Sequence, residues 1–403
     1  MISYSYYIRT AAAIRLGPLP NEGAPKMTKP EQERTSGLSI EQIFVTAENQ
    51  VRRLITAHPG QIPMYTEGGR WHFGQDSWAQ VWTGGFLAGM MWVFAERTGD
   101  PFWRDQAERY TRSIDPRRLE SGIHDIGFLF SPSWGRWHDL DPSEETSDAL
   151  IRGGRIMASY FNPGGRYLRT WVDKGSTFVD VMMEVDVIYR AASLAGDPEL
   201  AEIATAHALT ARRYLVRGDA STVHEGWFDP DTGEFLRTAT HQGFRSDSSW
   251  VRGLTWAIYG FGTAFQWTHD SRFLDTARRC ADFYMDKVGT DFVCPNDWAD
   301  PSPEFPYEAS AASIAASGML QLAELLGADG RAYMDYARHI VARLSEPDFL
   351  ETGVDGRDGV IKHAIYHRRH NLGVDESVMW GDYYFVEALH RLSKGGSQLP
   401  QLA

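Results

Sequence analysis

Cysteine is scarce in this sequence of 403 residues, which contains only Cys280 and Cys294. Two cysteines cannot build the disulfide framework that stabilises small secreted folds, so the sequence predicts no such framework. A reducing compartment, the cytoplasm, is therefore the expected location.

Positive charge is also in short supply, because the formal net charge is −13 at pH 7. Proteins that bind nucleic acid need a basic face for the phosphates, so this balance argues against a nucleic-acid partner. A small anionic substrate remains compatible with the charge if positive side chains gather locally.

Long apolar runs are missing as well. Residues 1–38 hold one short run of three alanines and an isoleucine between Arg9 and Arg15, too short for the core of a signal peptide. No other segment approaches the length of a membrane span, so no membrane partner is expected. We interpret residues 1–38 as a leader and residues 39–403 as one domain, because no Pro/Ser-rich linker divides the chain. A monomer or a small homo-oligomer is expected.

Motifs for metals and nucleotides are absent from the sequence. It contains no HExxH motif, no metal-binding cysteine pair and no acidic calcium loop. It also contains no GxSxG motif, Walker loop or dinucleotide fingerprint. We therefore expect neither a metal nor a cofactor.

Aromatic residues, in contrast, are abundant at 13%, and 14 of them are tryptophans. A surplus of tryptophan suits a cleft in which flat rings stack on sugars. The alternative is that these are large core residues, which accounts for most of them.

One pattern recurs along the chain: a buried apolar helix, a tight turn that usually contains aspartate, and an amphipathic surface helix. A first amphipathic helix is expected at 39–58, and buried helices at 78–98, 178–195, 250–268 and 307–326. Their surface partners are expected at 102–114, 199–216, 272–288 and 331–344, and strand-like runs at 226–229 and 234–237. Five or six pairs closing on themselves predict an all-α toroid, the (α/α)6 barrel, with irregular loops and short strands at its mouth. An open helical solenoid is the alternative.

The stretch 241–256 joins a polar loop to the third of these buried helices, with Asp247 or Ser248 expected near the N-cap. Arg252 lies between Trp250 and Trp256, and a guanidinium seldom enters an apolar interior without a partner. The partner is either a carboxylate of a ligand or an acidic side chain of the protein, with two core tryptophans beside it.

Two aspartates are candidates for chemistry. Asp180 stands inside an apolar run, which should raise the pKa of its carboxyl so that it can donate a proton near neutral pH. Asp125, between His124 and an Ile-Gly-Phe turn, is the natural second acid, because sugar chemistry uses paired carboxylates. Taken singly, Asp180 also fits a helix N-cap and Asp125 a turn residue.

Other polar and aromatic residues could complete such a site. His224 and Gln242 can bind hydroxyl groups, although each also fits an ordinary loop position, and Trp82, Trp250 and Trp256 offer stacking faces. A basic cluster, which is either a solvated loop or an anion site, comprises His363, His367, Arg368, Arg369 and His370.

Taken in order, these motifs resemble the unsaturated glucuronyl hydrolases, glycoside hydrolase family 88. The resemblance covers roughly residues 39–393. It rests on Trp82-Thr83-Gly84-Gly85-Phe86, His124-Asp125-Ile126-Gly127-Phe128, Asp180-Val181-Met182-Met183, His241-Gln242-Gly243, Trp250-Val251-Arg252-Gly253, Ala315-Ala316-Ser317-Gly318, Gly373-Val374-Asp375-Glu376 and Trp380-Gly381-Asp382-Tyr383. Each motif alone is weak, whereas the ordered set is specific.

The resemblance implies a six-hairpin barrel that removes a Δ4,5-unsaturated uronic acid from the non-reducing end of lyase-generated oligosaccharides. It implies hydration of the enol-ether double bond, in which Asp180 protonates C4 and helps water to add at C5. Asp125 would be the second essential carboxylate. The implied pocket for the unsaturated sugar consists of Trp82, His124, His224, Gln242, Trp250, Arg252 and Trp256.

Substrate preference is less fixed by the motifs. Glycosaminoglycan-type disaccharides are favoured, and the charge of Arg368 and Arg369 predicts contact with a sulfated or carboxylated next sugar. The chain departs from the family pattern at Glu308-Ala309-Ser310-Ala311, where Asp-Thr/Ser-Ser-Ala is common, and at Glu184, where Asn is common. The alternatives are an unsaturated rhamnogalacturonyl hydrolase acting on pectin fragments and a non-catalytic carbohydrate-binding protein of the same fold.

Overall fold

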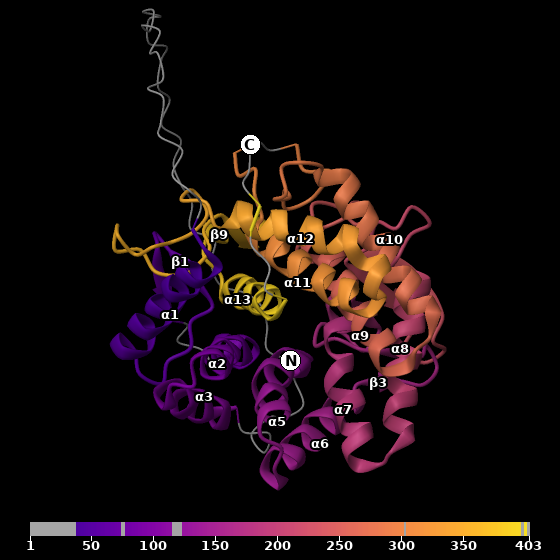
Figure 1. Ribbon diagram of the computed structural model, residues 1–403. Helices are drawn as coiled ribbons and strands as arrows, with labels where there is room; N and C mark the ends of the chain where they lie inside the picture. Colours follow the sequence, from indigo (N-terminus) through magenta and orange to yellow (C-terminus); the bar gives the residue numbers. More distant parts are fainter. Residues whose placement is uncertain (1–37, 74–76, 115–122, 302–303, 396–398, 401–403) are drawn as a thin grey trace, which may run out of the picture. The chain divides into compact units, whose positions relative to one another are not determined.

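Helices make up most of the computed structural model, which describes residues 38–73, 77–114, 123–301, 304–395 and 399–400 (Figure 1). These residues belong to one compact unit that spans 37–403. The expected leader, residues 1–38, lies outside the described residues except for Leu38.

Among the described residues, six inner segments follow one another around a ring. They are α2 (Ser77–Thr98), α4 (Ile126–Phe130) with η2 (Ser131–Gly135) and α5 (Arg136–Leu140), η3 (Val179–Met183) with α7 (Val185–Ala195), α9 (Val251–Thr268), α11 (Ala309–Leu326) and α13 (Met379–Lys394). Each segment contacts the next, and α13 contacts α2, which closes the ring. Neighbours cover the inner helices on several sides, which is why α11 is buried without interruption from Ala309 to Ala323.

Outer helices cover this ring. They are α1 (Ile40–Ala57), α3 (Pro101–Ser113), α6 (Glu144–Ala158), α8 (Pro198–Tyr214), α10 (Ser271–Val288) and α12 (Arg331–Leu344). Their pairing with the inner segments confirms the predicted (α/α)6 barrel, and Figure 1 shows the later pairs α9 with α10 and α11 with α12 side by side.

The turns between inner and outer helices contain the predicted aspartates. Asp100, Asp197 and Asp270 are the N-caps of α3, α8 and α10, and each carboxylate accepts a backbone N–H from the first turn of its helix. Before two of these caps, α7 ends at Gly196 with φ 62° and α9 ends at His269 with φ 54°, both left-handed. The chain therefore reverses within a few residues.

Short antiparallel strands lie just before several inner segments. One sheet has the order β5 (Ser176–Phe178), β6 (Glu225–Phe228) and β7 (Phe235–Ala239). In another sheet, β8 (Ala364–His367) pairs with β9 (Leu372–Glu376). Further hairpins are β1 (Tyr65–Glu67) with β2 (Arg70–His72) and β3 (Phe161–Asn162) with β4 (Tyr167–Leu168). The runs expected at 226–229 and 234–237 are confirmed as β6 and β7 to within two residues. Because β5 leads into η3 and the β8–β9 hairpin precedes α13, these strands border the ends where inner segments begin.

Some local expectations differ from the structure. The expected Ile-Gly-Phe turn at 126–128 is instead the start of a helical segment, 126–140, that is broken by a π-helix at Ser131–Gly135. The helix expected at 178–195 is a 3-10 turn followed by α7. Asp180 therefore lies inside that 3-10 turn and is not an N-cap. Ser248 lies near the N-cap of α9 as expected, but the N-cap itself is Trp250 and the Ser248 hydroxyl bonds Asp297 at 2.6 Å.

Among the described residues, one apolar stretch within Ala309–Leu344 has the length and composition of a membrane span, which the sequence analysis overlooked. In the fold, 72% of its most apolar window is buried. Here α11 contacts α9 and α13, so packing inside the barrel accounts for the apolar composition.

Candidate active site

Asp125 and Asp180 come from neighbouring inner segments and lie at one site. The chain near Gly127 packs directly on the end of η3, since a Cβ on Gly127 would lie 2.6 Å from the carbonyl oxygen of Met183. Both carboxylates are mostly buried, with 14% of the Asp125 side chain and 13% of the Asp180 side chain exposed. The structure thus brings together the two predicted acids and leaves each of them within reach of solvent.

Each aspartate faces the Nε2 atom of a buried histidine. His224 Nε2 lies 3.7 Å from Asp180 Oδ1, and His124 Nε2 lies 3.8 Å from Asp125 Oδ1. The other ring nitrogen accepts backbone N–H groups: Nδ1 of His224 accepts those of residues 241 and 242, and Nδ1 of His124 accepts that of Trp171. An accepting Nδ1 carries no proton, so in each neutral ring the proton is on Nε2, toward the acid.

Burial shifts the proton affinities of these groups in opposite directions. It raises the pKa of Asp180 to about 7, with a further rise from the charge of Asp125 and an opposing effect of Arg252. It likewise raises the pKa of Asp125 to about 7. The pKa of His124 falls to about 3 and that of His224 falls well below its usual value. Near neutral pH the site therefore offers carboxyls that exchange protons beside uncharged imidazoles.

A third carboxyl, Glu184, belongs to the same cluster. Its side chain is fully buried, and Oε2 accepts the backbone N–H of Gly127. Burial raises its pKa well above the usual range, and the charges of Asp125 and Asp180 raise it further. Burial and these two charges thus favour the protonated form of Glu184, which stands where the sequence departs from the family pattern.

Arg252 has several partners within the protein. It donates to the carbonyl oxygens of Ile365 and Tyr366 and to the side-chain oxygen of Gln242. Its Nη1 lies 3.6 Å from Glu308, which is fully buried. The protein acid foreseen as one alternative is therefore present, and a contact between Arg252 and a ligand stays a prediction.

The tryptophans differ in exposure. Trp82 is half-buried, and its ring lies 6.0 Å from that of Tyr366. Trp250 and Trp256 are each only 2% exposed, so the expectation that they offer free stacking faces is wrong. Trp250 instead packs between His224 and Arg252, 4.5 and 4.4 Å away.

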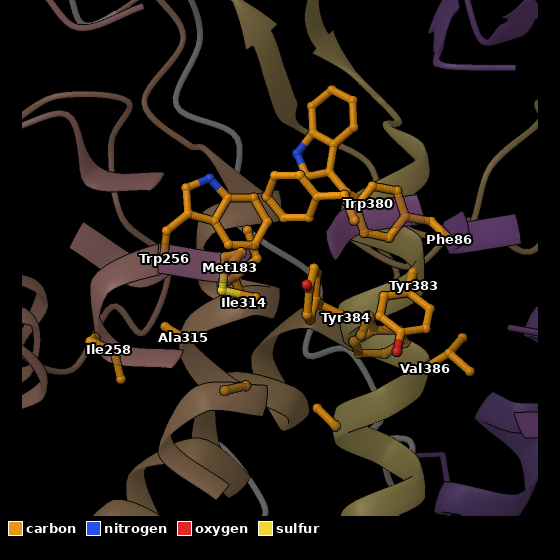
Figure 2. Packing of buried hydrophobic residues seen from close by; sticks show 14 of the residues in the cluster. Phe86, Met183, Trp256, Ile258, Ile314, Ala315, Trp380, Tyr383, Tyr384 and Val386 are labelled. Atoms are coloured by element: carbon orange, nitrogen blue, oxygen red, sulfur yellow. The ribbon is translucent and has the colours of Figure 1, made fainter. Parts of the chain in front are cut away.

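Trp256 belongs to the packed layer beneath the site. Figure 2 shows Trp256, Met183, Trp380 and Tyr384 converging from three inner segments. Trp256 contacts the ring of Phe128, 4.9 Å away, and Phe128 is part of the segment that carries Asp125. Both buried tryptophans therefore act as supports for polar groups of the site.

The basic cluster divides into parts with different surroundings. Arg369 is exposed, bonds the carbonyl oxygen of Phe244 at 3.0 Å and adds a small effect to the burial that lowers the pKa of His224 and His367, so it borders the site. Arg368 instead lies 4.6 Å above the ring of Phe305 and 3.7 Å from Glu304. His363 is bound to Asp375 at 2.6 Å.

Sequence reasoning missed some residues around the acids. Trp171 is half-buried, and its ring lies against His241 as well as its backbone against His124. Tyr366 joins Trp82 and the Arg252 guanidinium. Neither belongs to a motif, and the only signal for them was the surplus of aromatic residues.

A cavity of about 240 Å³ lies among the inner segments and is lined in part by Gly127, Phe128 and Met183. Its lining is polar, but its arginines bind neighbouring acids: Arg136 binds Glu387 at 2.6 Å and Arg190 binds Asp186 at 2.8 Å. The charges within each of these pairs offset one another.

Comparison with known proteins shows the family to which the chain belongs. The chain is 33% identical over 327 residues to the unsaturated glucuronyl hydrolase of Bacillus sp. strain GL1, covering 78% of this chain and 86% of that protein. The chain belongs to the unsaturated glucuronyl hydrolase family. A second unsaturated glucuronyl hydrolase, from Formosa agariphila, is 30% identical and covers 77% of this chain and 79% of its own length.

Other similar proteins extend this family relationship. An unsaturated chondroitin disaccharide hydrolase of Streptococcus pyogenes is 28% identical over 78% of this chain and 81% of its own length. The crystal structure of the Bacillus enzyme has a TM-score of 0.83 at 29% identity, covering 89% of this chain and 98% of that one. An unsaturated glucuronyl hydrolase specific for heparin gives 0.83 at 27% identity, with coverage of 90% and 99%. No family model matches the sequence.

Proposed function

We propose that this glycoside hydrolase removes a Δ4,5-unsaturated glucuronic acid from the non-reducing end of lyase-generated oligosaccharides. The observation that carries the proposal is the pair Asp125 and Asp180, two buried carboxyls with pKa values of about 7, each facing a neutral histidine. Such groups can give and take a proton at neutral pH. Family membership supports the choice of substrate.

Asp180 acts first as an acid and then as a base. Its protonated carboxyl donates to C4 of the unsaturated ring, and the positive charge that develops at C5 is shared with the ring oxygen. Water then adds to C5 and gives its proton to the Asp180 carboxylate. The product is a hemiketal, which opens and releases the next sugar, so one water is consumed and the acid is restored.

The surrounding groups hold the sugar for this proton transfer. Asp125 and the Nε2–H groups of His124 and His224 are placed to bind hydroxyls of the ring, with Trp82 as the half-exposed aromatic face. Gln242 already gives its oxygen to Arg252, which leaves its amide N–H groups for the substrate. Fixing the ring this way lowers the entropy cost of reaching the transition state.

A glycosaminoglycan-type disaccharide is the favoured substrate. The exposed Arg369 supports this choice, because it borders the site and can approach a sulfate or carboxylate on the second sugar. The chondroitin disaccharide hydrolase and the heparin-specific enzyme among the relatives support it as well.

The decisive experiment follows the enol-ether absorbance of an unsaturated chondroitin disaccharide on addition of the protein. We expect the absorbance to disappear with wild type and with Asp247→Asn, an exposed acid, and kcat/KM to fall at least about 100-fold in Asp180→Asn. No loss with glycosaminoglycan, gellan or ulvan fragments would remove the proposal. Turnover of pectin-derived disaccharides alone would identify a rhamnogalacturonyl hydrolase, and binding without turnover would identify a carbohydrate-binding protein.

We also propose the cytoplasm as the location. Cys280 and Cys294 are both free and buried, which supports a reducing compartment. Fractionation of cells that produce the full chain would test this, and recovery of the protein outside the cells would contradict it.

A further inference from the structure

Glu308 joins three segments beneath the site. Its carboxylate caps α11, where Oε2 accepts the N–H of Ala311 at 2.6 Å and Oε1 accepts the hydroxyl of Ser310 at 2.6 Å. Oε1 also accepts the N–H of Ile365 in β8 at 3.0 Å and lies 3.6 Å from Arg252 Nη1 of α9. A helix cap alone needs only the first of these contacts. The contact with Arg252 goes beyond a cap and sets the carboxylate beside the guanidinium.

Arg252 interacts electrostatically with two acids, Glu308 and Asp180. Its charge favours the ionised form of Asp180, which opposes the burial that keeps this carboxyl protonated. Trp250 fixes the guanidinium from one side, with its ring 4.4 Å away. Without a nearby negative charge, Arg252 would lower the pKa of Asp180 further and favour loss of the proton that the reaction needs.

The other ionisable groups around Asp180 come from several segments. Those that act on it or face it are Arg252 of α9, Asp125 before α4, Glu184 after η3 and His224 before β6. His207 of α8, which also packs against η3, is buried and its pKa is lowered to about 3, so it is neutral. Burial is the largest influence on the pKa of Asp180, and among these groups Arg252 is the cation that opposes it.

We propose that Glu308 is a positioning residue that fixes Arg252 and offsets its charge, so that Asp180 stays protonated for the reaction. This inference rests on the proposed role of Asp180 as the acid. It also assigns a role to position 308, where the chain departs from the family pattern, because one carboxylate serves both the helix cap and the guanidinium.

The test measures kcat/KM against pH for variants that separate charge from structure. In Glu308→Gln the uncompensated Arg252 should lower the pKa of Asp180, so the alkaline limb of the profile moves down by about one pH unit. Glu308→Asp keeps the charge and should restore the limb to its wild-type position. Ser310→Ala removes a hydrogen bond from the same carboxylate without a charge change, so it should lower the unfolding temperature and leave the limb in place.

A double variant shows whether Glu308 acts through Arg252. In the Arg252→Gln background, Glu308→Gln should produce no further shift of the limb. An equal shift in both backgrounds, or an unshifted limb in a folded Glu308→Gln protein, would overturn the proposal.

A titration without substrate separates this inference from the proposed function. Infrared difference spectra of each protein against its Asp180→Asn counterpart report the protonation of Asp180 directly. A lower pKa in Glu308→Gln supports the inference even if no disaccharide is turned over. An unchanged pKa contradicts it even if wild type is an active enzyme.

Discussion

His224 Nε2 and Asp180 Oδ1 lie 3.7 Å apart, and neither has a hydrogen-bond partner among the described residues. The distance is slightly too long for a hydrogen bond and too short for an intervening water. Catalytic hydrogen bonds are often long before a substrate binds and shorten in the complex. We interpret the pair as an acid and its donor that a bound sugar ring draws together.

Replacing His224 by asparagine tests this pair. The asparagine oxygen can accept the N–H groups of residues 241 and 242 as Nδ1 does, whereas the donor toward Asp180 disappears. We expect kcat/KM to fall about 10- to 100-fold, measured with the unsaturated disaccharide. His207→Asn is the matched control, because His207 also accepts a backbone N–H on Nδ1 but lies on the outer helix α8. Equal activity losses in both variants would argue against the pair.

The rate should depend on pH through the buried acids. Because Asp180 donates a proton and its pKa is about 7, kcat/KM should fall about tenfold per unit as the pH rises above 7. Asp125 has a pKa of about 7 as well, so the limb reports the pair rather than one residue. A profile of kcat/KM from pH 5 to 9 checks this, and a flat profile up to pH 9 is incompatible with it.

The raised pKa of Asp180 should also make the stability of the protein depend on pH. The pKa of Asp180 is raised from 3.8 in the unfolded chain to about 7, so its contribution to stability is present below pH 4 and is lost as the pH rises to 7. The unfolding free energy of Asp180→Asn relative to wild type should therefore grow by about 1.4 kcal/mol per pH unit across this window. Urea unfolding at several pH values measures it, and Asp247→Asn should show no such growth.

Within the basic cluster, Arg369 should contribute more than Arg368 to the preference for a sulfated second sugar. Arg369 is exposed beside the site, whereas Arg368 packs on Phe305 near Glu304. We expect Arg369→Gln to lower kcat/KM for a sulfated disaccharide about tenfold relative to an unsulfated one, and Arg368→Gln to have a smaller effect. If neutralising both arginines leaves the ratio of the two substrates unchanged, the cluster has no part in selection.

Neighbouring glycines of α2 should differ sharply in their tolerance of alanine. A Cβ on Gly85 would lie 2.2 Å from the carbonyl oxygen of Phe128, whereas a Cβ on Gly84 would meet the side chain of Ile62 at an ordinary 3.4 Å. Gly85→Ala should lower the unfolding free energy by about 3 kcal/mol or more and reduce activity, because it displaces the segment that carries Asp125. Gly84→Ala should be neutral or raise it by about 0.5–1 kcal/mol. Urea unfolding distinguishes them.

Much of the barrel could be predicted because its signals are local. Helical period, an aspartate cap such as Asp197 and a glycine such as Gly196 all lie within one turn of the residues they organise. The segment 126–140 escaped prediction because its π-helix is stabilised by tertiary packing and has no period of its own.

In the site, too, features set by neighbouring residues could be predicted, whereas features set by residues distant in the sequence could not. The apolar flanks of Asp180 were enough to predict its raised pKa, since burial is the largest cause. The partner of Arg252 could not be chosen from the sequence, because Glu308 lies 56 positions further along and only the folded chain brings it near. The burial of Trp250 and Trp256 likewise depends on neighbours contributed by other inner segments.

The contact between α13 and α2 makes the last helix of the chain a neighbour of the first inner helix. Thr66 and Glu376, which are 310 positions apart, are joined by a hydrogen bond at the same seam. Joining such distant residues carries a large entropic cost that is recovered only when the final turn docks. During synthesis the ring of helices therefore stays open, with apolar surface exposed, until α13 has left the ribosome. Chaperones would be needed most at this stage.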